Sequence, residues 1–315
     1  MKKLFRILIV LLIALSFISC GKEVTSQEAK EALSKHLIER YGEEFEIGYI
    51  GRRSDGDDDI WYQAEIYPSK YVGTPKERDK YYRESGTVNI EKGIFGEKLG
   101  KAGDTYGIVK VNESAEEFYG KKLEELFGNN VLQVYDIWFN RILEDYSFEN
   151  IVKVSDEERT ALIIKGGIYI FGRVENDEDR EWYRKQIYEF IQFMKESGTF
   201  EYVDLDILIV DERALISNPK KLLENFPKNL SENDRRKKKR EMMKAGDKEF
   251  ADMSKKEILN KINSINKAEY RNRFFGGLLY VKVYSPKYIK AQKLDNREEK
   301  EYDTINNIKF DWETW

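Results

Sequence analysis

Residues 25–42 read TSQEAKEALSKHLIERYG, and this stretch predicts an amphipathic helix with both ends marked. Thr25 precedes Glu28 by three positions, the capping-box spacing that satisfies two free backbone donors at a helix start. Gly42 supplies the left-handed conformation that commonly ends a helix. The apolar residues repeat every fourth position and form one stripe: Ala29, Leu33, Leu37 and Tyr41.

Two segments with alternating apolar residues follow this helix, at 45–49 and 60–67. A polar turn separates them, so we expect an antiparallel hairpin. The chain of 315 residues is 41% hydrophobic and 36% charged, which fits folded domains rather than a disordered chain. The expected class is α+β, in which helices are followed by antiparallel β-hairpins.

Glycine and capping residues place the next elements. A Thr-Pro start predicts a helix over 74–85, and six glycines within 86–107 predict loops and short strands. We expect a strand at 108–111 and then a helix that begins at Ser114 and ends at Gly128.

In the second half, a Gly-Gly pair at 166–167 lies between two apolar runs. It predicts a hairpin whose strands are 161–164 and 168–171. A long amphipathic helix is expected over 177–197. The most strand-like run of the chain, which begins at Phe200, follows it.

These elements suggest a body at 25–217, which could divide into 25–112 and 113–217. The segment Leu37–Gly42 resembles Leu123–Gly128, which raises the alternative of a duplicated helix-plus-sheet unit. A polar and basic linker or helix over 218–250 and a C-terminal helix with strands over 251–315 complete the expected organisation.

The first twenty residues have the features of an export signal. Three basic residues within the first six precede an apolar run at 7–18, which is shorter than the roughly 20 residues that span a bilayer. Ser19 then supplies a small residue, and Cys20 is the only cysteine of the chain.

This arrangement resembles the signal peptide of bacterial lipoproteins, and the resemblance covers residues 1–20 only. It implies cleavage between Ser19 and Cys20, removal of the signal peptide 1–19, and diacylation of the Cys20 thiol. Residues 20–24 would then be the lipidated cysteine and a spacer. The resemblance places the protein on the extracytoplasmic side of the cell membrane or outer membrane, held by its lipid anchor.

Composition excludes several classes of function. One cysteine and one histidine allow neither a disulfide framework nor a Cys/His zinc site, and we expect no metal and no cofactor. Loss of 1–19, which carries three basic and no acidic residues, changes the formal charge from −4 to −7. Such a chain is not a general nucleic-acid binder, so the expected partners are the membrane, through the lipid, and an envelope protein or polymer.

Three polar features of the sequence are candidate sites. His36 is the only imidazole and fits a structural role better than that of a general base. The acidic stretch 55–59 fits a solvated turn better than a calcium loop. The third feature is a basic run that could contact an anionic surface or form a solvated linker: Arg235, Arg236, Lys237, Lys238, Lys239 and Arg240.

No catalytic signature is present in the sequence. The sequence therefore favours a membrane-anchored lipoprotein that acts as a non-catalytic interaction or accessory module of the cell envelope. Two alternatives remain open at this point, a solute-binding lipoprotein and a carboxylate-based hydrolase.

Overall fold

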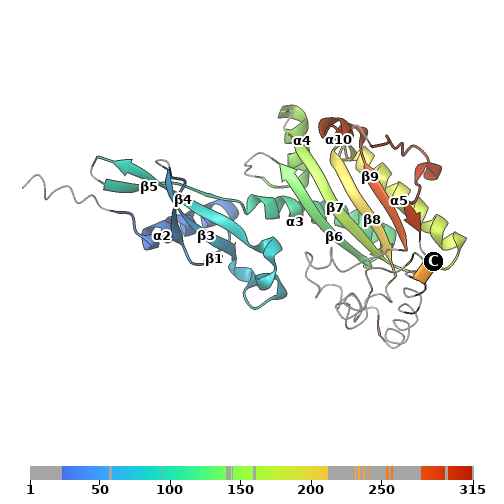
Figure 1. Cartoon of the computed structure of the whole chain (residues 1–315), viewed down its shortest axis with the longest axis horizontal. Helices are drawn as coiled ribbons and strands as arrows, with labels where there is room; N and C mark the ends of the chain where they lie inside the picture. Colours follow the sequence, from blue (N-terminus) through green and yellow to red (C-terminus); the bar gives the residue numbers. More distant parts are fainter. Residues whose placement is uncertain are drawn as a thin grey trace, which may run out of the picture. The chain divides into compact units, whose positions relative to one another are not determined.

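The computed structural model divides the chain into two compact units, Met1–Gly107 (unit 1) and Ile108–Trp315 (unit 2) (Figure 1). The residues that it describes are 23–56, 59–94, 96–139, 143, 145–158, 161–211, 278–294 and 297–313, with single positions between 231 and 257.

Among its described residues, unit 1 consists of one long helix and an antiparallel sheet (Figure 1). The strand order is β1-β3-β4-β5, and β2 also pairs with β3. Its elements are α2 (Ser26–Tyr41), β1 (Phe45–Ile47), β2 (Gly51–Ser54), β3 (Ile60–Pro68), β4 (Glu84–Gly93), β5 (Gly96–Asp104) and three short 3-10 helices (Ser69–Tyr71, Pro75–Arg78 and Lys80–Tyr82).

Helix α2 confirms the prediction from its sequence. Thr25 is the N-cap and forms both hydrogen bonds of the capping box with Glu28. Gly42 adopts a φ of 67° and its N–H donates to the Ile38 carbonyl. The stripe residues Ala29 and Leu33 are buried, so this face of the helix packs on the sheet.

Residues 74–107 of unit 1 differ from their prediction. The expected helix at 74–85 is two 3-10 turns, and the glycine-rich stretch 86–107 contains most of a long β4–β5 hairpin. The glycines serve close packing here, because a Cβ at Gly86 would lie 2.8 Å from the Leu33 side chain. Helix α2 can therefore approach the sheet closely at this point.

Unit 2 contains a mixed sheet in the order β10-β9-β8-β7-β6 (Figure 1). Strands β7 and β8 are parallel, joined through α5, and the other pairs are antiparallel. The elements are α3 (Gly107–Phe127), β6 (Val131–Phe139), α4 (Phe148–Glu158), β7 (Leu162–Phe171), α5 (Asp177–Glu196), a 3-10 turn (Phe200–Tyr202), β8 (Val203–Val210), β9 (Leu279–Tyr284), α10 (Pro286–Ala291), a second 3-10 turn (Ile305–Asn307) and β10 (Trp312–Glu313).

One hydrophobic core joins helices and sheet in unit 2. Tyr119 of α3, Phe148 of α4 and Ile187 of α5 pack with sheet residues such as Ile164 and Ile207. The three helices therefore supply the core against one face of the sheet. Helix α5 spans Asp177–Glu196, close to the predicted 177–197.

The start of α3 was predicted wrongly. Residues 108–111 are helical rather than a strand, and the helix begins at Gly107 instead of Ser114. Val111 lies one turn before Ala115 on the buried stripe, so its β-branched side chain continues the helical pattern.

The predicted hairpin at 161–171 was also wrong, because residues 162–171 form the single strand β7. A Cβ at Gly166 would lie 2.6 Å from the Val134 carbonyl oxygen and 2.8 Å from Tyr135 Cδ1. Glycine is therefore required here by the close approach of β6 and not by a turn.

Both units combine helices with mainly antiparallel strands, which confirms the α+β class. Helices α2 and α3 each end at a left-handed glycine before a strand, with φ of 67° at Gly42 and 68° at Gly128. Beyond this point the topologies differ, since β3, β4 and β5 form an antiparallel meander whereas β7 and β8 are parallel. The similarity between Leu37–Gly42 and Leu123–Gly128 is thus that of two helix ends. The strands of the two described sheets are connected differently.

We predict that Gly166→Ala destabilises unit 2 by about 1–3 kcal/mol, because the added methyl group overlaps the β6 backbone. Gly103→Ala is the matched control, since its Cβ would have only ordinary contact with Thr87, at 3.6 Å, and its effect should stay within about 0.5 kcal/mol. Chemical denaturation of both variants measures the difference. Equal unfolding free energies would contradict the packing argument.

Candidate functional site

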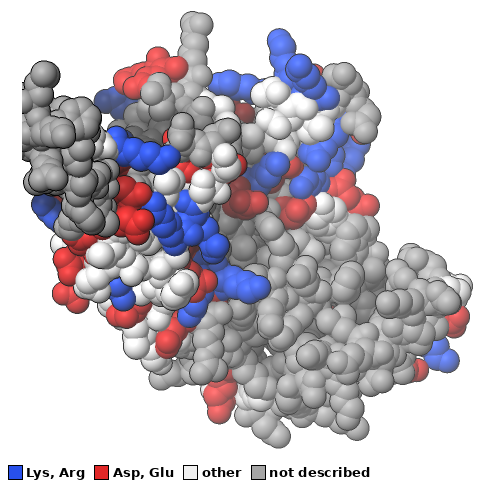
Figure 2. All heavy atoms as spheres, turned by 60° about the vertical axis from the view of Figure 1, so that its left-hand side comes forward, with Lys and Arg blue, Asp and Glu red and all other residues white. Residues whose placement is uncertain are grey.

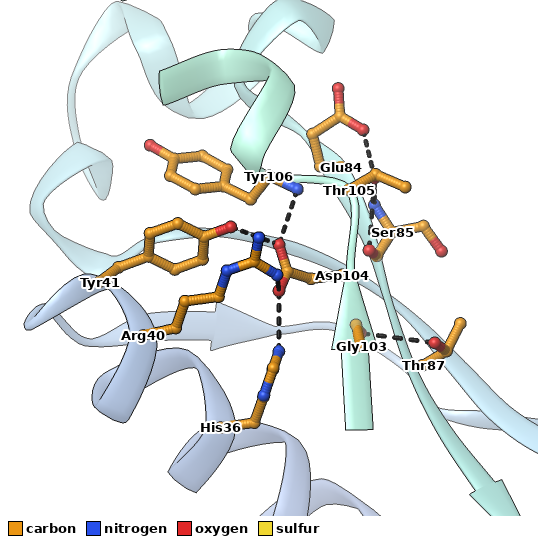
Figure 3. Close-up of polar contacts among 10 residues, drawn as sticks. All are labelled: His36, Arg40, Tyr41, Glu84, Ser85, Thr87, Gly103, Asp104, Thr105 and Tyr106. Carbon is orange, nitrogen blue, oxygen red and sulfur yellow. Dashed lines mark hydrogen bonds and ion pairs between the residues drawn. The ribbon is translucent and has the colours of Figure 1, made fainter. Parts of the chain in front are cut away.

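The most highly connected polar group described in unit 1 is the carboxylate of Asp104, whose side chain has 0% exposure (Figure 3). Its Oδ2 contacts His36 Nε2 and Arg40 Nη1, each at 2.8 Å. Its Oδ1 accepts from the Tyr41 hydroxyl at 2.6 Å and from the Tyr106 backbone N–H at 2.9 Å. Four groups therefore converge on one buried carboxylate.

Local structure brings these groups together. His36 and Arg40 are four residues apart and therefore project from one face of α2 (Figure 3). Asp104 is the last residue of β5. The rings of Tyr41 and Tyr106 pack edge to face with centroids 5.3 Å apart, which covers the carboxylate with apolar surface.

This arrangement suits a structural crosslink better than acid–base chemistry. A carboxylate offers about four acceptor positions, and each oxygen of Asp104 already has two partners. A substrate or metal could bind this carboxylate only by displacing one of those partners. His36 contacts a carboxylate, which is the kind of group that orients a general base. Because that carboxylate has no free acceptor position, we assign His36 to a structural cluster between α2 and β5, the Asp104 clamp.

A second carboxylate lies beside the clamp. Glu84 Oε2 accepts a hydrogen bond from the Thr105 hydroxyl at 2.5 Å (Figure 3). Burial raises the pKa of Glu84, and the nearby charge of Asp104 adds to this increase. The hydrogen bond from Thr105 offsets only part of the increase in pKa. A second negative charge, on Glu84, is therefore less favourable here than in water.

Unit 2 has a surface groove of about 520 Å³. Phe118, Phe148 and Val152 provide apolar lining from α3 and α4, and Ser197 and Thr199 add hydroxyl groups. The remaining lining residues all project from α4: Glu149, Lys153, Asp156 and Glu157. An apolar floor with three carboxylates and one ammonium group suits a partly apolar, basic ligand.

A second charged network lies on β8 and β9. Asp204 and Asp206 alternate with core residues of β8, so they face away from α3, α4 and α5, and Tyr288 of α10 hydrogen-bonds to Asp204. Lys282 Nζ lies 3.1 Å from Asp204 and 2.9 Å from Asp206, and Arg297 lies 3.3 Å from Asp204. Burial acts to raise the pKa of Asp204, but the positive charges of Lys282 and Arg297 outweigh it and hold the pKa below its usual value. The network pairs the buried carboxylate of Asp204 and the partly exposed carboxylate of Asp206 with basic groups.

The residues predicted from the sequence fall mainly outside these clusters. Ser19, Cys20 and five of the six basic residues, Arg235, Arg236, Lys238, Lys239 and Arg240, lie outside the described residues. Lys237 is described and exposed. In the acidic turn, Asp55 is exposed and 57–58 lies outside the description.

Within the described ranges, no group of three or more His, Cys, Asp or Glu side chains is placed to hold a metal. The described helices likewise include none with the length and apolar character needed to cross a bilayer. Basic and acidic side chains are interspersed over the coloured surface in Figure 2. A mixed surface of this kind gives no broad area of one sign in that view.

The sequence does not predict the Asp104 clamp, because the side chains that contact Asp104 lie 63 to 68 positions before it in the chain. A local signal did exist for the β8 network. The order Val203-Asp204-Leu205-Asp206-Ile207 alternates apolar and acidic residues, which is typical of a strand with one charged face.

Comparison of the chain with protein-family models, with curated proteins and with solved structures finds no match.

We predict that Asp104→Asn lowers the unfolding free energy by about 3 kcal/mol, because it removes the buried negative charge that pairs with Arg40 and accepts from His36. Glu39→Gln is the control, since the Lys35–Glu39 pair is exposed and should contribute no more than about 0.5 kcal/mol. Chemical denaturation of the two variants tests this. A loss for Asp104→Asn as small as that of the control would show that the clamp does not hold the helix.

Proposed function

We propose that the chain is a lipid-anchored, extracytoplasmic protein of a bacterial cell envelope and that its folded body is a non-catalytic interaction module. The observation that carries the proposal is the export-signal pattern of residues 1–20, which ends at the only cysteine of the chain. Cys20 would carry the acyl chains, since two chains give stable anchoring where one is marginal.

The start of the described fold supports this position for an anchor. Val24 is 5% exposed, and its backbone is already hydrogen-bonded to unit 1. The folded body thus begins four residues after Cys20. Cleavage before Cys20 would leave the capping box and helix α2 intact.

The described polar clusters favour binding over catalysis. The carboxylate of Asp104 has its acceptor positions occupied, and the β8 network pairs its charges. The carboxylates of the groove lie on one helix, α4, and so line a single wall. A carboxylate-based hydrolase needs two carboxyl groups on opposite sides of the scissile bond, which one wall does not provide.

The groove on unit 2 is where we place the partner, as a basic and partly apolar segment of an envelope protein. The apolar floor would take an aromatic or aliphatic side chain, and the carboxylates of Glu149 and Glu157 would attract the flanking basic groups. The formal charge of −7 on the chain without 1–19 would add to this attraction.

A solute-binding lipoprotein would be built from two similar lobes. The sheets of the two units have different connectivity, which supports the interaction module over that alternative.

Replacing Cys20 with Ala tests the anchor. The variant should keep its signal and incorporate no acyl chains, because the thiol that accepts the lipid is gone. Ser19→Ala keeps a small residue at the cleavage position and should be processed normally. Gel mobility and labelling with an alkyne fatty acid report both outcomes, and cleavage of Cys20→Ala at the same site would refute the proposal.

Thermal shift of the mature protein tests the groove. A peptide Lys-Phe-Lys should raise the melting temperature by mass action, and Glu-Phe-Glu should not. Glu149→Lys combined with Glu157→Lys should abolish the shift, and the exposed control Glu117→Lys should retain it. If the double variant responds to Lys-Phe-Lys as the unmodified protein does, the groove is not the binding site.

A further inference from the structure

The first described residues of unit 1 are attached to the start of strand β5. The Val24 N–H donates to Glu97 Oε2 at 3.2 Å, and the Val24 carbonyl accepts from the Tyr62 hydroxyl at 2.8 Å. Arg52 holds Glu97 in place through two hydrogen bonds, at 2.9 and 2.5 Å. The chain is therefore fixed to the sheet from Val24 onward.

The length of the chain between Cys20 and Val24 then limits how far the start of β5 can lie from the lipid. Four residue steps join Cys20 to Val24 and span at most about 14 Å when fully extended. The acyl chains of a lipidated Cys20 would be in the bilayer. Glu97 and its neighbours must then remain close to the membrane surface.

The tip of the β4–β5 hairpin lies directly beside Glu97. Gly93 pairs with Gly96 at the end of the hairpin, and Glu97 is the next residue. Ile94, at the tip, is 96% exposed, the highest value among the exposed large apolar side chains that are described. Hairpin turns ordinarily use polar residues or glycine, so an exposed isoleucine at this position calls for an explanation.

Three basic and two acidic side chains lie next to the tip, so its local charge is positive. Lys92 and Lys98 flank the tip opposite Glu97 and Glu91, with Lys98 Nζ 2.7 Å from Glu91, and Arg52 reaches Glu97 from strand β2. Basic side chains around an apolar side chain are typical of a segment that enters the interface of an anionic bilayer. In the sequence, Ile94 is also followed by Phe95, a second apolar residue.

We propose that the tip of the β4–β5 hairpin contacts the bilayer that holds the lipid of Cys20, with Ile94 entering the interface and the flanking lysines meeting anionic headgroups. This inference rests on the proposed lipid anchor. The acyl chains and the tip together give two points of attachment and set the orientation of unit 1 on the membrane.

The experiment uses the single cysteine of the chain. Acylation consumes the thiol of Cys20, so an Ile94→Cys substitution in the lipidated mature protein creates one reactive thiol. An environment-sensitive fluorophore is attached there. The protein is then placed in vesicles of phosphatidylglycerol and phosphatidylcholine that contain lipids with brominated acyl chains as quenchers.

The expected result is a loss of roughly half or more of the fluorescence at position 94. Val72→Cys is the matched control, because Val72 is 52% exposed and follows the opposite end of β3. Its fluorescence should be nearly unchanged. Vesicles without phosphatidylglycerol should reduce the quenching at position 94, since the lysines then lose their anionic partners.

Two contrary results are distinguishable. If mass spectrometry shows two acyl chains on the labelled protein but positions 94 and 72 are quenched equally or not at all, the hairpin proposal is overturned and the anchor stands. If the protein reaches its mature form without acyl chains, both the anchor and the hairpin proposal fail.

Discussion

Helix α2 and strand β5 are joined at both ends by polar contacts, and the organisation of unit 1 depends on this pairing. At one end, the buried carboxylate of Asp104 accepts from the last turns of the helix through His36, Arg40 and Tyr41. At the other end, the backbone just before the helix bonds to Glu97. A buried carboxylate without such donors would carry a large desolvation cost. The helix and the strand must therefore stay packed in the position that keeps these hydrogen bonds.

The same pairing links the fold to the proposed function. Because the segment before α2 is fixed to the sheet, the distance between a lipidated Cys20 and the body is limited by the four residue steps to Val24. A longer spacer would allow the body to move away from the bilayer and turn freely. A short one would instead keep the side of unit 1 that carries the hairpin tip next to the membrane.

Sequence patterns predicted the elements whose determinants are local. The capping box and Gly42 define both ends of α2, and the structure confirms both. The prediction failed where glycine serves close packing, as at Gly166, because a turn signal and a close backbone approach have the same composition. The contact between His36 and Asp104 spans 68 positions and depends on how the helix packs, so no local pattern predicts it. The groove was missed for the same reason, since Phe118 and Thr199 meet only in the folded unit.

Mass spectrometry of the intact protein purified from the membrane fraction tests the lipid anchor itself. We expect a chain that starts at Cys20, lacks residues 1–19, and has a mass increased by the diacylglycerol group. A chain that retains Met1, or one that starts elsewhere without acyl groups, would contradict the lipid anchor on which the functional argument depends.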